Sequence, residues 1–310
     1  MDYELNEDQQ AILDAVDSLL ERHAGPARAI ELQPEGRYDV ELEAALHDAG
    51  FLDVARDDSM GPLEAALVCE AVAKAGGVVS AGVAALIAPA LSEEELPLPI
   101  AVTGADHEGP IRFGSDARTL LILAGDEARI APLEPGELKS VPSNFGYPMG
   151  SRPDDLATRG SSLGAGSGGT LARWWRLSLA IEAAGTMIAA LDQTVGYLKE
   201  RRQFGRAIAS FQAVQHRLAE CAISSQGSRW LALEAAHKGA PEEMAATAVA
   251  YAMSSAAQVF AETHQLSGAI GFTREHDLHV WSMRLQALRL EMGGVSGHRR
   301  AIVEARWGDQ

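Results

Sequence analysis

The chain reads YLKERRQFGRAIASFQAVQHRLAE from Tyr197 to Glu220. Within this stretch three arginines, Arg201, Arg202 and Arg206, surround a Phe-Gly break between two helical patterns. Guanidinium groups match phosphate oxygens in pairs, and the N-terminus of the second helix also favours negative charge, so the segment predicts an anion site. A solvated helix end, paired with neighbouring glutamates, is the simpler interpretation of the same residues.

A second segment, rich in small residues, runs from Gln265 to His279 and reads QLSGAIGFTREHDLH. Serine, glycine and alanine at 267–269 would let another backbone or a planar ligand approach closely. A helix end followed by a tight turn would have the same composition. The segment therefore predicts either a contact surface for a ligand or an ordinary helix stop.

The chain as a whole is acidic. Its 310 residues include 26 lysines and arginines against 43 aspartates and glutamates, which gives a formal net charge of −17. This charge disfavours nucleic acids and anionic membranes as partners. Two scattered cysteines, an acidic N-terminus and no uninterrupted apolar run of about 18 residues predict a soluble, cytoplasmic protein with no metal site and no membrane span.

The texture of the sequence predicts three domains. Amphipathic and apolar helical patterns fill residues 1–96, and short β-like runs separated by turn residues follow. Glycine and serine dominate residues 160–169, which is typical of a flexible linker. Long helical patterns near 171–202, 210–238, 241–267 and 275–292 then predict an antiparallel bundle. The expected fold is mostly α, with an N-terminal helical domain (1–96), a small central β domain with its linker (97–169) and a C-terminal four-helix bundle (170–310).

Taken together, the two segments resemble the paired C-terminal motifs of the flavin-dependent acyl-CoA dehydrogenases, R-x-x-F-G-x-x-I-x-x-F-Q-x-x-Q-H and Q-x-x-G-G-x-G-[FY]. Their order and separation agree, and the helix–β–helix organisation extends the resemblance over the whole chain. It implies FAD-dependent α,β-dehydrogenation of an acyl-CoA thioester to trans-2-enoyl-CoA. Electrons would leave to an electron-transferring flavoprotein. The shortened β region resembles bacterial members that act on steroid or other bulky CoA esters.

The resemblance also assigns site residues. In the family the flavin lies between subunits, so Arg201 would bind the flavin pyrophosphate of a neighbouring subunit. Arg176 matches a position close to the CoA nucleotide. Ala269 stands where the second motif usually has glycine. The remaining residues expected to contact FAD are Gln203, Phe204, Ile208, Phe211, Gln265 and Gly268.

The catalytic base is not at either position that the family commonly uses. Counted from the motifs, those positions fall on Met292 and Trp175, and neither is a carboxylate. Glu182 follows Trp175 by seven residues, which places it on nearly the same helical face, in an apolar neighbourhood. It is the expected base, unless it is a paired core residue. Glu291 is the reserve, although it would point about 100° away from position 292 around a helix.

A second interpretation makes the chain an interaction subunit. A β domain this short would leave the flavin ring incompletely covered, so the chain would complete the FAD site of a longer homologous subunit in a dimer or tetramer. A homo-oligomer that carries its own FAD is the alternative. The sequence does not set the preference for acyl chain length or ring system.

Overall fold

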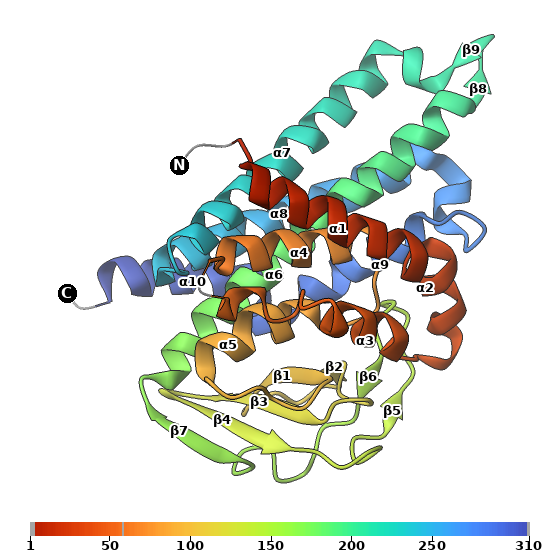
Figure 1. The fold of residues 1–310 in the computed structure, drawn as a ribbon. Coiled ribbons are helices and arrows are strands. Elements are labelled where there is room, and N and C mark those ends of the chain that lie inside the picture. The colour runs from red at the N-terminus through yellow and green to blue at the C-terminus, as the bar shows by residue number, and fades with distance from the viewer. Residues whose placement is uncertain (1–3, 58, 309–310) are drawn as a thin grey trace.

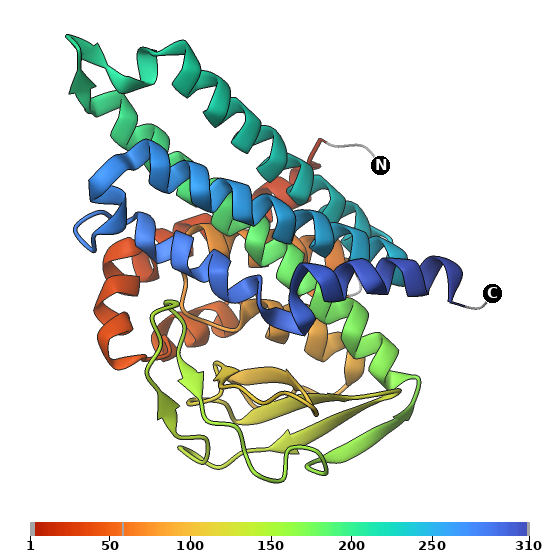
Figure 2. The same cartoon turned by 180° about the vertical axis from the view of Figure 1, so that it is seen from behind.

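The computed structural model describes residues 4–57 and 59–308. The small β region lies at one end of the molecule, and helices from both the N-terminal and the C-terminal parts of the chain lie against it (Figures 1 and 2). This order along the chain confirms the mostly helical class with a small central β region. The N-terminal elements are α1 (Glu7–His23), α2 (Pro26–Leu32), α3 (Val40–Asp48), α4 (Pro62–Lys74), a π-helical turn (Val83–Ile87) and α5 (Ala88–Leu91).

Local sequence signals explain where the first helices begin. Asn6 accepts a hydrogen bond from the backbone N–H of Gln9, and the Gln9 side chain accepts one from the backbone N–H of Asn6, which is a reciprocal capping box. Pro62 occupies the first turn of α4, where its missing N–H costs nothing. Helix α4 is buried over most of its length, because α1, α6 and α7 all pack against it.

The β region consists of two small sheets. One has the strand order β1-β3-β4-β7, in which β1 and β3 are parallel and the other pairs are antiparallel. The other has the order β2-β6-β5 and is antiparallel throughout. The strands are β1 (Ile100–Gly104), β2 (Ile111–Arg112), β3 (Thr119–Ala124), β4 (Glu127–Pro132), β5 (Ser140–Val141), β6 (Met149–Gly150) and β7 (Ser161–Ala165).

The glycine-rich stretch 160–169 is not a linker. Half of it forms β7, which pairs with β4, and helix α6 begins at Ser167 after the single residue Gly166. The glycines serve close packing: a Cβ on Gly160 would lie 2.8 Å from the carbonyl oxygen of Ile130, and one on Gly168 would lie 2.3 Å from that of Gly125. Composition suggested flexibility because the backbone contacts that require glycine involve residues far away in the sequence.

The C-terminal helices pack around one central helix. Helix α6 contacts α4, α7, α8 and α9, and its far end carries a short β-hairpin that projects away from the sheets (Figures 1 and 2). The expected helices are present, although α9 starts later and ends earlier than the pattern indicated. The elements are α6 (Ser167–Glu200), β8 (Arg202–Gln203), β9 (Arg206–Ala207), α7 (Gln212–His237), α8 (Glu242–Ser267), α9 (Leu278–Leu288) and α10 (Gly294–Trp307).

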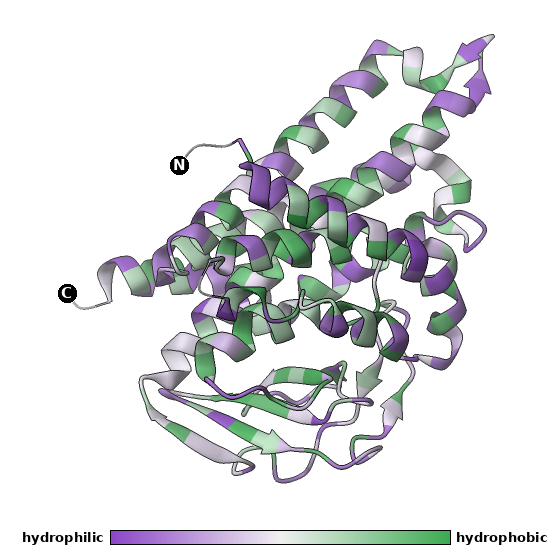
Figure 3. Ribbon diagram, viewed as in Figure 1, coloured by the Kyte–Doolittle hydropathy of each residue, from purple (hydrophilic) through white to green (hydrophobic). Residues whose placement is uncertain are grey.

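One segment, Glu242–Phe272, is long and apolar enough to cross a membrane by length and composition. It consists of α8 and the short 3₁₀ turn after it, and α8 packs against α6, α7, α9 and α10. Half of the residues of α8 are buried, whereas the projecting hairpin is largely hydrophilic (Figure 3). The hydrophobicity of α8 is therefore that of a central bundle helix.

Candidate active site

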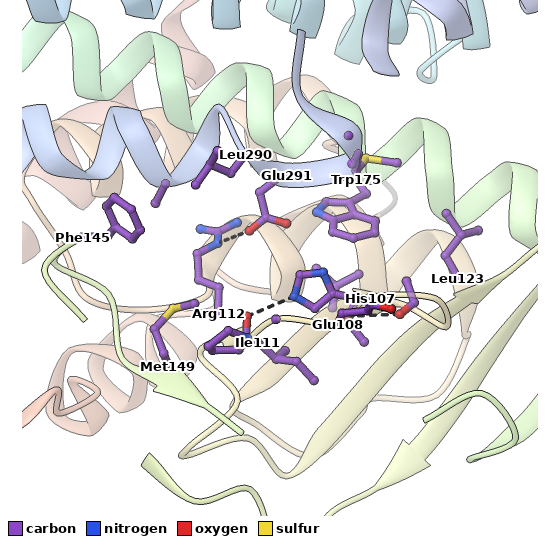
Figure 4. A pocket seen from close by; sticks show the side chains of 18 of the residues that line it. His107, Glu108, Ile111, Arg112, Leu123, Phe145, Met149, Trp175, Leu290 and Glu291 are labelled. Carbon is purple, nitrogen blue, oxygen red and sulfur yellow. Dashed lines mark hydrogen bonds and ion pairs between the residues drawn. The ribbon is translucent and has the colours of Figure 1, made fainter. Parts of the chain in front are cut away.

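A cavity of about 850 Å³ opens between the β region and the C-terminal helices (Figure 4). This volume is in the range of small-molecule and cofactor sites. Residues of β1 and β2, the loop that joins them and the loop before β6 form one side. Helices α6, α9 and α10 and the turn between α9 and α10 form the other. The cavity thus lies at the junction of two of the three parts of the chain.

Arg112, at the end of β2, joins two glutamates from different helical segments. Its Nη1 donates to both carboxylate oxygens of Glu182 at 2.8 Å, and its Nε donates to Oε1 of Glu291 at 3.2 Å. Tyr147 donates its hydroxyl to Glu182 at 2.7 Å. Arg112 and Glu291 line the cavity, whereas Glu182 lies behind Arg112 and is not part of the cavity wall.

The backbone next to Arg112 adopts an uncommon conformation. Phe113 has a φ of 63°, which is rare for a residue with a side chain and costs free energy. Its ring is almost fully buried, edge-to-face against Tyr38 and Tyr147. The Arg112 guanidinium lies 5.0 Å from the ring centres of both Phe113 and Tyr147. These contacts fix the direction in which Arg112 points.

Burial changes the acidity of this group of side chains. Loss of water raises the pKa of Glu291, and Arg112 opposes that rise while the charge of Glu182 adds to it. Burial, together with the charge of Glu182, also raises the pKa of the Tyr147 hydroxyl. The Glu291 side chain is only 21% exposed, yet it faces the cavity. A carboxylate with a raised pKa beside a ligand-sized cavity is suited to accept a proton.

Unpaired polar atoms gather elsewhere on the cavity wall. Within the described residues, Trp175 Nε1 and Arg176 Nε are buried without a hydrogen-bond partner. Arg300 and the turn at Gly293 also line this part, and α10 begins at Gly294 without a side-chain cap. Burial lowers the pKa of Arg176. Unsatisfied donors, cationic groups and a helix N-terminus together fit a ligand with negative charge.

The residues expected to contact FAD through the first motif lie far from this cavity. Arg201, Gln203 and Phe204 are exposed on the hairpin that β8 and β9 form, and 90% of Phe204 is exposed. Ile208 and Phe211 follow it and are partly buried. Phe204 packs edge-to-face on Phe211 at 6.2 Å. The hairpin end thus presents aromatic and cationic groups outward.

The second motif lies at the end of α8. Gln265 and Gly268 are exposed, and Gly268 has a φ of 67° at the C-terminus of the helix. This segment approaches α6 where the ring of Tyr197 meets that of His276, at 5.1 Å between ring centres. The structure therefore places both motifs on the outside of the bundle. Among the described residues, those of the two motifs do not line a common pocket.

Several residues of the cavity and of the side-chain cluster behind it could not be identified from the sequence. Arg112 and Tyr147 are isolated in short strands and loops, and only the fold brings them to Glu182. Trp175 was marked by position counting, but only as a missing carboxylate. Glu291 is not part of an α-helix, because α9 ends three residues earlier at Leu288 and the backbone of Met292 has a φ of 51°. The angle expected from helical geometry therefore does not apply to it.

One cluster outside the cavity has the composition of a cation site. Ligand atoms of His47, Asp53 and Glu95 lie within 4.8 Å of one another, although the three residues are too far apart in the sequence for a spacing pattern to predict the grouping. His47 already pairs with Glu95 at 2.7 Å, and Asp53 pairs with Arg56. These contacts account for the clustering of the three side chains without an ion.

Comparison with known proteins agrees with the motifs. Residues 169–307 match the model of the acyl-CoA dehydrogenase C-terminal domain. The acyl-CoA dehydrogenase IpdE2 of Mycobacterium tuberculosis is 41% identical over 106 residues, which span about a third of each chain. IpdE2 of Mycolicibacterium smegmatis is 28% identical over 90% of this chain and 93% of its own.

Solved structures share the whole fold. A variant of the Tcur3481–Tcur3483 steroid ACAD superposes with a TM-score of 0.79 at 22% identity, covering 98% of both chains. A chain of the ChsE4-ChsE5 complex from Mycobacterium tuberculosis gives a TM-score of 0.76, also at 22% identity, over 99% of both chains. The motifs and the match over residues 169–307 agree, and the chain resembles the acyl-CoA dehydrogenases, whose fold it shares.

Proposed function

We propose that this protein takes part in the FAD-dependent α,β-dehydrogenation of an acyl-CoA thioester to the trans-2-enoyl-CoA. The observation that carries the proposal is the cavity, where the buried carboxylate of Glu291 faces a space large enough for a flavin ring and an acyl group. Removal of an α proton needs such a base within hydrogen-bond reach of the reacting carbon.

The residues of the cavity fit FAD and the CoA thioester. Members of this family use FAD. The unpartnered Nε1 of Trp175 and Nε of Arg176 are donors that a bound ligand would satisfy. Bound FAD would supply the acceptor for the hydride that leaves the β carbon. Arg176 and Arg300 would hold phosphate groups, and the apolar walls would exclude water from the α carbon.

We assign the role of catalytic base to Glu291 and keep Glu182 as the alternative. The sequence had favoured Glu182 over Glu291. Glu291 lines the cavity, and Arg112 Nε is its one hydrogen-bond donor among the described residues. Glu182 accepts hydrogen bonds from Arg112 on both oxygens and from Tyr147, and lies behind the cavity wall. A carboxylate engaged in this way is less available to a substrate.

The second candidate function is that of a half-site subunit. Helical geometry places Arg201 roughly 37 Å along α6 from Arg176, so the hairpin and the cavity serve different ligands or different copies of one ligand. The exposed Phe204 and Arg201 then suit a flavin held largely by another subunit. A structural neighbour with this fold, the ChsE4-ChsE5 complex, pairs two differently named chains, which motivates a longer homologous partner.

The acyl group and the electron acceptor belong to the same proposal. The structural neighbour Tcur3481–Tcur3483 is a steroid ACAD, and a cavity of about 850 Å³ suits a bulky acyl group of that kind. Electrons would pass to an electron-transferring flavoprotein, as the family resemblance implies.

Anaerobic bleaching of bound flavin tests both candidates. The chain is purified alone and after co-expression with a longer homologous subunit, and a panel of straight-chain and ring-bearing acyl-CoAs is added without oxygen. Bleaching by the chain alone supports the complete enzyme. Bleaching only after co-expression supports the half-site subunit, and no bleaching in either preparation contradicts the proposed reaction.

A further inference from the structure

We infer that Arg112 is a positioning residue whose charge is divided between Glu182 and Glu291, and that Glu182 keeps this buried guanidinium paired when Glu291 takes up a proton. This inference rests on the proposed function, in which Glu291 is the base. It assigns separate roles to the two glutamates: Glu291 exchanges a proton with the substrate, and Glu182 balances the positive charge of Arg112.

The geometry of the two pairs is unequal. Glu182 receives two hydrogen bonds of 2.8 Å from Arg112 and one of 2.7 Å from Tyr147, whereas Glu291 receives one of 3.2 Å. Charge-assisted hydrogen bonds of this kind strengthen as they shorten. The pair between Arg112 and Glu291 is therefore the weaker one. Glu291 is the carboxylate that can change partners.

The burial of Arg112 makes the second carboxylate necessary. Its side chain is only 6% exposed, and a buried charge that loses its partner is strongly unfavourable. If Glu291 were the sole partner, its protonation would leave the guanidinium unpaired, which would oppose proton uptake. Since Glu182 holds Arg112 through two hydrogen bonds of its own, Glu291 can become neutral while Arg112 stays paired.

The charged groups around Glu291 come from several elements. Arg112 faces it from β2, Glu182 from α6 and His107 from the loop after β1. Arg112 and His107 lower the pKa of Glu291, while burial and Glu182 raise it. Arg176 of α6 and Arg300 of α10 share the same cavity, as do Asp106 and Glu108 in the loop after β1. Arg284 of α9 lies 5.2 Å from the Tyr147 ring and adds positive charge behind Glu182.

Because Arg112 lowers the pKa of Glu291 and Glu182 raises it, substitutions of these two residues should have opposite effects on the titration of Glu291. Glu182→Gln keeps the shape of the side chain and removes its negative charge, so Glu291 should release its proton at lower pH. Arg112→Gln removes the positive charge, so Glu291 should release its proton at higher pH. We expect each substitution to change the proton-dissociation constant of Glu291 about tenfold or more, and the double variant to return it toward the wild-type value.

Infrared difference spectroscopy measures this without a bound flavin. The C=O band of protonated carboxyl groups is followed against pH, and the part that disappears in Glu291→Gln belongs to Glu291. Glu70→Gln is the matched control, because Glu70 is also a buried glutamate paired with an arginine, in a different part of the fold. It should leave the Glu291 titration unchanged. Thermal unfolding shows that each variant is folded.

Opposite displacements of the Glu291 titration support the inference, and displacements in the same direction, or none, overturn it. The acid limb of the pH profile for anaerobic flavin reduction should move with the infrared titration in each variant. If the titrations move as expected but no acyl-CoA reduces flavin, the coupling stands and the proposed reaction fails. If flavin is reduced while the titrations do not move, the reaction stands and the coupling fails.

Discussion

Gly185 of α6 and Glu70 of α4 lie so close that a Cβ on Gly185 would fall 2.5 Å from the Glu70 carbonyl oxygen. That oxygen belongs to the backbone of a buried helix and has little freedom to move. At this contact the N-terminal helices and the bundle approach each other too closely for any side chain at position 185 of α6.

Gly185→Ala should therefore destabilise the protein, by about 2 kcal/mol or more, because two helices must separate to admit the methyl group. Gly196 offers a control in the same helix, since the residue is exposed and a Cβ there would meet no atom of a neighbouring segment within 4 Å. Gly196→Ala should stabilise the protein by up to about 1 kcal/mol through helix propensity. Thermal or urea unfolding of both variants gives the comparison, and equal effects would contradict the close contact.

The pair Glu70–Arg229 links α4 to α7 and supplies a second prediction. Arg229 Nε donates to both Glu70 oxygens, at 2.6 and 2.9 Å. Arg229→Ala should cost about 3–5 kcal/mol of unfolding free energy, since it leaves a buried carboxylate without its partner. The double substitution Glu70→Gln with Arg229→Met should recover most of that loss in urea unfolding. A double variant as unstable as the single one would show that packing, rather than charge pairing, dominates there.

A third prediction concerns pH and the buried Glu43. Burial raises its pKa to about 7 from the ordinary 4.5, although the Tyr38 hydroxyl donates to it and opposes the rise. The folded state therefore holds this proton more tightly than the unfolded state. The resulting stability is present below about pH 4.5 and is lost as the pH rises to 7, by roughly 3 kcal/mol.

Glu43→Gln removes this dependence. It should raise the melting temperature relative to wild type at pH 8 and have little effect at pH 4.5, as measured by calorimetry at both values. A difference between variant and wild type that is the same at the two pH values would show that Glu43 does not titrate in this range.

The assignment of the base leads to a fourth prediction. Glu291→Gln should slow anaerobic flavin reduction roughly 10²-fold or more, while flavin and acyl-CoA still bind. Glu182→Gln should slow flavin reduction less than about tenfold, because it only makes Glu291 a weaker base. This comparison is made at a pH where Glu291 has lost its proton in both the wild type and the variant. Rapid-mixing absorbance measures both rates. The reverse order would return the role of base to Glu182.

The hairpin residues give a fifth prediction. Arg201→Ala should reduce flavin content and oligomer mass together, since Arg201 is exposed and would reach a flavin in a neighbouring subunit. Lys199→Ala, a neighbouring exposed cation on α6, should change neither. Flavin absorbance and light scattering after gel filtration provide the two readings. A monomer that binds one FAD with undiminished affinity would contradict the role of Arg201.

The helices and their order could be predicted from the sequence because their signals are local. The capping box at Asn6 and Gln9 is one example, and the stop at Gly239 followed by Pro241 is another. The two motifs also lie within the part of the chain that matches the acyl-CoA dehydrogenase C-terminal domain. Each of these signals depends on residues a few positions apart, and the structure places those residues as the pattern required.

The chemistry of the cavity could not be predicted in the same way. Arg112 and Glu182 are 70 positions apart, and Arg112 and Glu291 are 179 apart. No spacing rule joins them, and a lone arginine in a two-residue strand resembles any surface cation. The glycines at 160 and 168 were misleading for the same reason, because the carbonyl oxygens that exclude a side chain there belong to other segments.

The length of α6 has a genetic consequence. This one helix carries cavity residues near its start and the hairpin at its end, so each subunit would contribute to two separate flavin sites. A chain with a defective cavity and a chain with a defective hairpin would rebuild one intact site when they assemble together. Two inactive alleles of this gene, such as Glu291→Gln and Arg201→Ala, should therefore complement each other in a mixed oligomer.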